Sequence, residues 1–143
     1  MSLTHPEIAM TDGPDGPAPV VLADVPAPTA AALADAVAHR RNGLAMGELD
    51  PDGVILVRRA GDLVDRLRPA PDATMAVLRL DPGDLGLVCD AAERYVAERD
   101  VDSYQPPEER ERITALREVR DSLRDAQARL MLAGLTAPDH SVA

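Results

Sequence analysis

The sequence predicts an α+β fold, a small sheet covered by helices and followed by a C-terminal antiparallel helical hairpin. The chain has 24 Ala and 17 Leu but two Tyr and no Phe or Trp, so its core is aliphatic and thin. Short apolar segments before residue 81 have the pattern of strands, and the segment from 81 to 133 has apolar residues spaced by three and four. With 143 residues, we expect one compact domain.

The first 19 residues are predicted to form a Pro/Gly-rich extended arm. Residues 12–19 read DGPDGPAP, and Pro lacks a backbone donor while Gly maximises backbone entropy. We therefore expect no self-contained helix or sheet in residues 1–19. Order would have to come from docking on this domain or on a second chain, with Leu3, Ile8 and Met10 as apolar anchors.

Residues 20–80 are predicted to form a small α+β region. The apolar residues 20–22 favour a short strand. A helix should follow over about residues 28–42, because Pro28 suits its first turn and Gly43 its C-terminal end.

A hairpin is predicted over about residues 44–58, where apolar segments flank the tetrapeptide DPDG at residues 50–53. Proline at the second position of such a tetrapeptide suits a type I turn. A short helix should span residues 60–68, and the apolar residues 74–80 predict the strand that joins the hairpin in one sheet.

Residues 81–133 are predicted to form the helical hairpin, and residues 134–143 a tail. The first helix of the hairpin should start at Pro82, with Asp81 as N-cap, and run to about residue 100. The second should run from the prolines before residue 108 to Ala133, where Gly134 ends it. The short connection favours antiparallel packing.

A leucine stripe marks the last helix, because leucines recur there every seven residues with smaller residues three positions after each. The stripe is either an internal seam of the hairpin or a seam with another chain. The helix is roughly 40 Å long, and the preceding helix covers only about two thirds of it. We therefore predict an interaction surface formed by Leu116, Val119, Leu123, Ala126, Leu130 and Ala133.

Charge argues against direct contact with nucleic acid. The chain has 25 acidic residues against 15 basic ones, all Arg, for a formal net charge of −10. This charge opposes the phosphate neutralisation that drives nucleic-acid binding. Acidic residues gather in the first 35 positions and again over residues 81–102, which leaves an acidic inhibitor of a nucleic-acid-binding protein as one alternative function.

Catalytic, cofactor and metal sites are not predicted. Cys89 is the one cysteine, lies in a predicted helix and has no histidine nearby in sequence, so we expect a small buried hydrophobe. The three histidines, His5, His39 and His140, stand apart, although metal sites need three or four ligands. A carboxylate-lined pocket formed in three dimensions would leave a small enzyme or ligand-binding domain as a further alternative.

Residues 48–55 match the first eight positions of a calcium-binding loop. The match fails at position twelve, where Arg59 stands in place of a bidentate Glu, and Pro51 restricts the loop. We predict the hairpin turn here and no calcium site.

We expect the protein to be cytoplasmic and to have a non-catalytic role. A single cysteine cannot form an internal disulfide, no basic residue precedes Arg40 as a signal peptide requires, and no uncharged segment approaches the ~20 residues that span a membrane. We expect an interaction, assembly or adaptor protein that acts through its C-terminal helices and N-terminal arm. Its partner would be a protein, either itself or another chain, in an oligomer or larger complex, with no membrane contact.

Overall fold

The computed structural model describes residues 6–13, 16–47, 50–100 and 105–134, which form three strands and four helices. The strands are β1 (Glu7–Gly13), β2 (Gly16–Pro26) and β3 (Met75–Leu80). The helices are α1 (Ala27–Ala45), α2 (Pro51–Leu67), α3 (Pro82–Asp100) and α4 (Pro107–Leu132). The predicted α+β class is confirmed.

The sheet is antiparallel with the order β1-β2-β3, and two of its strands come from a part of the chain where the sequence predicted otherwise. Residues 7–13 and 16–19 are strand rather than extended arm. Proline is tolerated here because β3 pairs only with residues 21–26 of β2. At Pro17 and Pro19, β2 has a neighbour on the β1 side alone, so the missing N–H groups cost no bond to a third strand.

The predicted hairpin at residues 44–58 is wrong, because α1 and α2 occupy this part of the chain. Asp50 caps α2, accepting a hydrogen bond from the Gly53 amide at 2.7 Å, and Pro51 is the first helical residue. The same Asp-Pro pair suits both a turn and a helix start. Proline fixes its own φ near −65°, and both the second residue of a type I turn and the first turn of a helix need this value. The predicted strand at 74–80 is confirmed as β3.

Helices α3 and α4 form the predicted antiparallel pair. Asp81 accepts a hydrogen bond from the Asp84 amide at 2.7 Å, as an N-cap residue does, and Gly134 ends α4 with a φ of +70°. Glu93 pairs with Arg124 at 2.7 Å, whereas Glu109, at the start of α4, pairs with Arg99 near the end of α3 at 3.1 Å.

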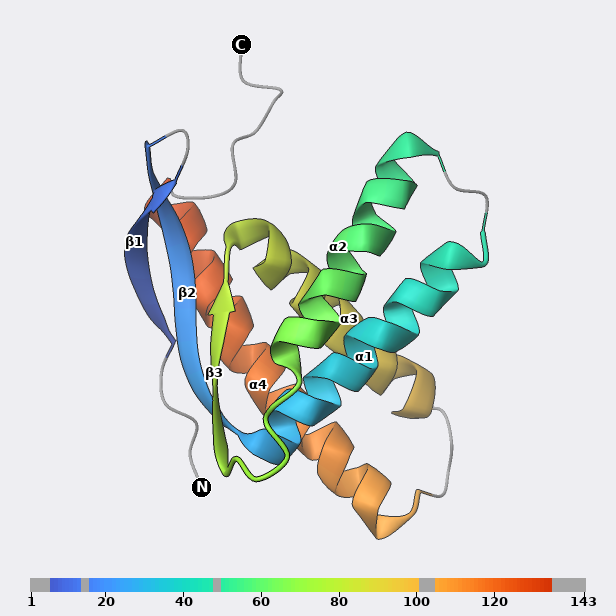
Figure 1. Cartoon of the computed structure of the whole chain (residues 1–143). Coiled ribbons are helices and arrows are strands. Elements are labelled where there is room, and N and C mark those ends of the chain that lie inside the picture. Colours follow the sequence, from blue (N-terminus) through green and yellow to red (C-terminus); the bar gives the residue numbers. More distant parts are fainter. Residues whose placement is uncertain (1–5, 14–15, 48–49, 101–104, 135–143) are drawn as a thin grey trace.

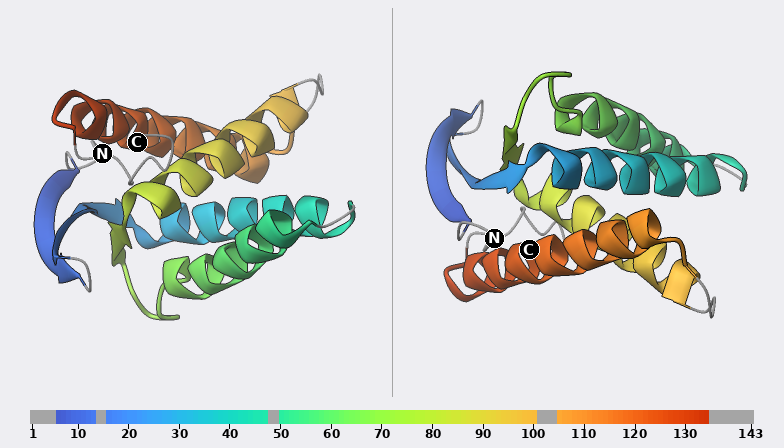
Figure 2. Two further views of the ribbon diagram at one scale, coloured as in Figure 1. Left: turned by 90° about the horizontal axis from the view of Figure 1, so that it is seen from above. Right: turned by 90° about the horizontal axis from the view of Figure 1, so that it is seen from below.

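The helices lie together on one side of the sheet, as both views of Figure 2 show, with α1 packed between α2 and the α3/α4 pair (Figures 1 and 2). Small residues on α1 make this central position possible, since Ala30 and Ala34 are fully buried and allow the neighbouring helices to approach closely. One continuous core joins all four helices to the inner face of the sheet.

Candidate interaction surface

The leucine stripe of α4 lies inside the domain. Ala133, its last member, is exposed at the end of the helix. Helix α4 packs against α1 and β1 as well as against α3, so its apolar side has cover beyond the helical hairpin. The predicted interaction surface is therefore wrong as a contact with a second chain, because its other members are at most 1% exposed: Leu116, Val119, Leu123, Ala126 and Leu130.

The predicted arm anchors have three different outcomes. Ile8 packs against the core of its own domain from β1, opposite Val21 of β2. Met10 is 51% exposed and is not among the apolar residues packed against the described core. Leu3 lies outside the described residues. Of the two anchors that the structure describes, Ile8 therefore makes the kind of apolar contact that the sequence predicted.

The acidic segment at the start of α3 is neutralised within the domain. Asp84 is 4% exposed and accepts hydrogen bonds from Arg59 at 2.8 Å and from Arg66 at 2.7 Å, both on α2. Arg59 also donates to Asp81 at 2.6 Å, and these carboxylates raise the pKa of its guanidinium. These acids therefore join α2 to α3 and do not form a free negative surface.

The middle of α3 continues this pattern. Asp90 pairs with Arg40 of α1 at 3.2 Å. The hydrogen bonds between Glu93 and Arg124 lower the pKa of the carboxyl and raise that of the guanidinium. An inhibitor that mimics nucleic acid needs uncompensated acids, so the acids of α3 do not support that alternative.

Tyr95 is the centre of a polar cluster to which α1, α3 and α4 contribute. Arg99 lies over its ring with the guanidinium carbon 3.5 Å from the ring centroid, and the Tyr95 hydroxyl donates to Glu109 at 3.0 Å. His39 packs edge-on against the same ring and contacts Glu98 at 2.8 Å. A His–Glu pair has the groups needed for acid–base chemistry.

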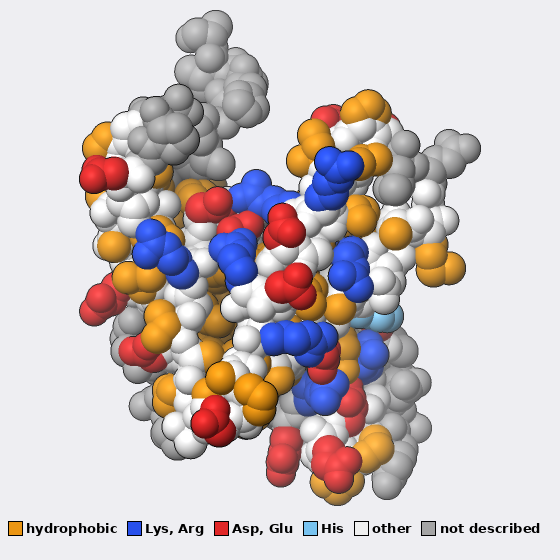
Figure 3. Space-filling view, in the orientation of Figure 1, with side chains coloured by type: hydrophobic (Ala, Val, Ile, Leu, Met, Phe, Trp, Pro, Cys, Tyr) orange, Lys and Arg blue, Asp and Glu red, His pale blue; other side chains and the backbone are white. Residues whose placement is uncertain are grey.

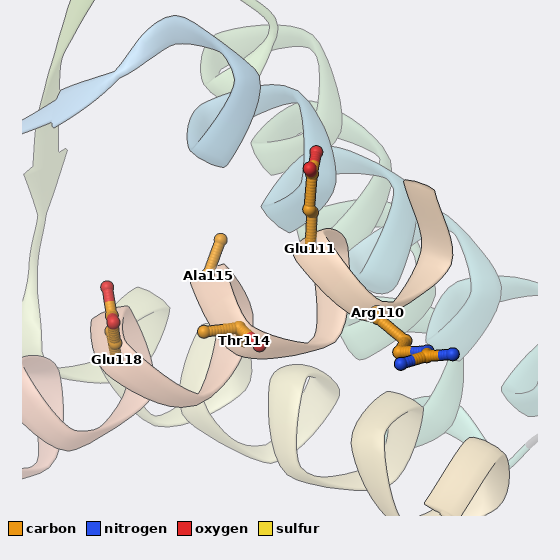
Figure 4. A pocket seen from close by; sticks show the side chains of 5 residues that line it. All are labelled: Arg110, Glu111, Thr114, Ala115 and Glu118. Atoms are coloured by element: carbon orange, nitrogen blue, oxygen red, sulfur yellow. The ribbon is translucent and has the colours of Figure 1, made fainter. Parts of the chain in front are cut away.

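Two surface hollows in the described part of the chain lie apart from the Tyr95 cluster. One hollow lies on the exposed side of α4 (Figure 4) and is open to solvent. A second, between the start of α1 and the segment before β3, is lined mainly by Ala and Pro. Neither includes a residue of the cluster, and the two carboxylates of the first hollow, Glu111 and Glu118, lie at an open surface and not in an enclosed pocket. The residues lining the first hollow are Arg110, Glu111, Thr114, Ala115 and Glu118.

Cys89 is a buried structural residue, as the sequence predicted. Its side chain is fully buried in the core, and burial raises the pKa of the thiol to about 11. The thiol is therefore protonated near neutral pH, while the thiolate is the nucleophilic form.

Within the described residues, no group of three or more His, Cys, Asp or Glu side chains is arranged to hold a metal ion. Residues 48 and 49 of the calcium-like segment lie outside the described part. The remainder begins α2, with Asp50 engaged as its N-cap.

The side of the sheet that carries Met75 and Val77 is the strongest candidate for an interaction surface. In β3, Leu78 and Leu80 are buried, whereas the alternate residues Met75 and Val77 are 48% and 67% exposed. Solvated sheet faces usually carry polar residues, so this arrangement departs from the normal alternation. Figure 3 shows hydrophobic side chains together with acidic and basic ones exposed on the sheet, at the left of the view.

Strand register places charges around these apolar side chains. Leu22 of β2 pairs with Glu7 on one side and with Arg79 on the other, so the three residues form one row across the sheet. In the next row Asp24 pairs with Val77. The charged residues Glu7, Asp24 and Arg79 form no ion pair within the described part of the chain. We call Glu7, Leu22, Asp24, Met75, Val77 and Arg79 the outer sheet face.

The sequence contains one signal for this face that could have been recognised. The strand MAVLRL places Met75, Val77 and Arg79 on the side opposite to the two buried leucines. The remainder was missed because β1 and the first half of β2 were predicted to be an unstructured arm, which removed Glu7 from the sheet.

Comparison with known proteins found no matching family model, no similar curated protein and no similar solved structure. None of the helices in the described residues has the length and apolar character needed to cross a membrane.

Proposed function

We propose that this protein is a non-catalytic interaction module whose contact surface is the outer sheet face. The observation that carries the proposal is the exposure of Val77 and Met75 on a rigid strand whose other side is in the core. Large apolar side chains on an otherwise solvated sheet face indicate a contact surface, since exposing them to water is unfavourable. The sheet holds them in fixed positions, so little conformational entropy is lost on binding.

Other exposed apolar residues give weaker support for a contact surface. Met46 and Ile55 lie at the adjoining ends of α1 and α2, and Met131 and Leu132 lie at the end of α4. Each group lies at the ends of helices, where a few apolar side chains are common on soluble domains. The outer sheet face differs because exposed apolar residues occur there next to unpaired charges of both signs.

Site-specific photocrosslinking tests this proposal. A benzophenone amino acid at position 77 is expected to form a covalent adduct with a second polypeptide in cells that express the protein. The same probe at position 46, which is also exposed but directly follows α1, serves as the matched control. Adding Leu22→Glu should abolish the adduct at position 77. The proposal fails if position 77 gives no adduct, or if Leu22→Glu leaves the adduct unchanged.

A further inference from the structure

We infer that the partner of the outer sheet face is a second copy of this chain, packed sheet against sheet around a two-fold axis. This inference rests on the proposed function, because it identifies the occupant of the same surface. It is carried by the charge pattern of the central row, in which Glu7 and Arg79 flank Leu22.

The central row is complementary to itself. Neighbouring strands lie about 4.8 Å apart, so Glu7 and Arg79 are equally spaced on opposite sides of Leu22. A two-fold axis that runs parallel to β2 in the contact plane exchanges these two sides. Arg79 of each protomer then lies over Glu7 of its partner, and Leu22 lies over its own copy.

The dimensions of packed sheets suit this arrangement. Sheets that pack face to face are about 10 Å apart. Leu22 occupies that gap with apolar contact, while the long side chains of Arg79 and Glu7 reach across it from the two sides. The same axis places Asp24 of β2 opposite its own copy, so one like-charge contact opposes the two Arg79–Glu7 pairs. Both ion pairs use groups that form no ion pair in the described part of one chain.

The net charge of −10 opposes self-association at long range. At physiological ionic strength the Debye length is about 8 Å, so distant acids are screened while direct pairs across the contact are not. In addition, most described acids of α3 already pair with arginines of their own chain. Repulsion between two copies is therefore weaker at the sheet than the formal charge indicates.

A charge-swap experiment on the purified chain tests the inference by sedimentation velocity over a range of concentrations. The wild type is expected to dimerise. Arg79→Glu places a glutamate opposite Glu7 of the partner at both contacts of the dimer, and Glu7→Arg places an arginine opposite Arg79 at both. Each variant alone should therefore dimerise at least tenfold more weakly. An equimolar mixture of the two variants, and the double variant alone, should regain the wild-type association.

The matched control is Arg58→Glu, which makes the same charge change at an exposed arginine of α2 that forms no ion pair in the described residues. It should dimerise like the wild type. All variants should keep their helical circular dichroism, because neither Glu7 nor Arg79 forms an ion pair in the described part of one chain.

Two results would overturn the inference. The first is a wild type that stays monomeric at every concentration, and the second is a mixture of the swapped variants that fails to associate. The photocrosslink at position 77 separates these failures from failure of the proposed function. An adduct with a different protein would refute self-association but keep the interaction surface, whereas no adduct would refute both.

Discussion

The guanidinium of Arg59 lies directly against Gly83, where a β-carbon would stand 2.5 Å from Arg59 Nη2. This close approach is what allows one arginine of α2 to bond both Asp81 and Asp84 at the start of α3. The absence of a side chain at position 83 therefore contributes to the contact between these two helices.

Gly83→Ala is expected to lower the free energy of unfolding by about 1–2 kcal/mol, because the new methyl group displaces Arg59 from the buried Asp84 carboxylate. Urea denaturation measures the change. Gly86→Ala is the matched control in the same helix, since a β-carbon there meets nothing closer than 3.7 Å. It should stabilise the fold by up to about 1 kcal/mol through helix propensity. Equal effects of the two substitutions would contradict the role of the close approach.

The buried thiol of Cys89 should lower the free energy of unfolding at alkaline pH. Its folded-state pKa is raised by burial to about 11, above the unfolded value, so only the unfolded state releases this proton between these pKa values. The contribution is fully present below about pH 9 and is lost as the pH rises toward 11, by on the order of 2–3 kcal/mol. The chain has no Lys, which removes the usual competing titration in this range.

Chemical denaturation at several alkaline pH values measures this effect, with Cys89→Ala as the control. The variant is less stable at neutral pH because it loses buried sulfur contacts, but its stability should fall less steeply between pH 9 and 11. Parallel curves for wild type and variant would show that the thiol makes no such contribution.

The leucines of α4 should act as core residues. Leu123→Ala is expected to lower the free energy of unfolding by about 2–5 kcal/mol, because it leaves a cavity among fully buried side chains. Leu132→Ala, at a position 89% exposed on the same helix, should change it by less than about 0.5 kcal/mol. Thermal and urea unfolding test the pair. If Leu123→Ala instead dissociates an oligomer of unchanged protomer stability, the assignment of this stripe to the core is wrong.

Tyr95→Phe is expected to destabilise the domain by about 1 kcal/mol, since it removes the hydrogen bond to Glu109 and leaves the ring in place. A double-mutant cycle with Glu109→Gln measures the coupling between the two side chains. A coupling energy indistinguishable from zero would show that this contact between α3 and α4 contributes nothing to stability.

Local signals in the sequence determined where most helices begin and end. Asp81 with Pro82 predicted the start of α3 correctly, and Gly134 the end of α4, because a cap acts on backbone groups within a few residues. The segment at residues 50–53 was predicted wrongly because Asp, Pro and Gly begin a helix as readily as they form a turn. Only packing of the following apolar residues against α1 distinguishes the two.

The tertiary structure alone decided which apolar residues are buried and which segments contact them. The periodicity of Leu116 to Leu130 established that one side of α4 is apolar, but part of its cover comes from α1, which lies about 80 residues earlier in the chain. Likewise, Glu7, Leu22 and Arg79 form one row only because β1 and β3 pair with opposite sides of β2. Burial and register depend on contacts between distant segments, and the pattern within one segment carries no information about which distant segment will meet it.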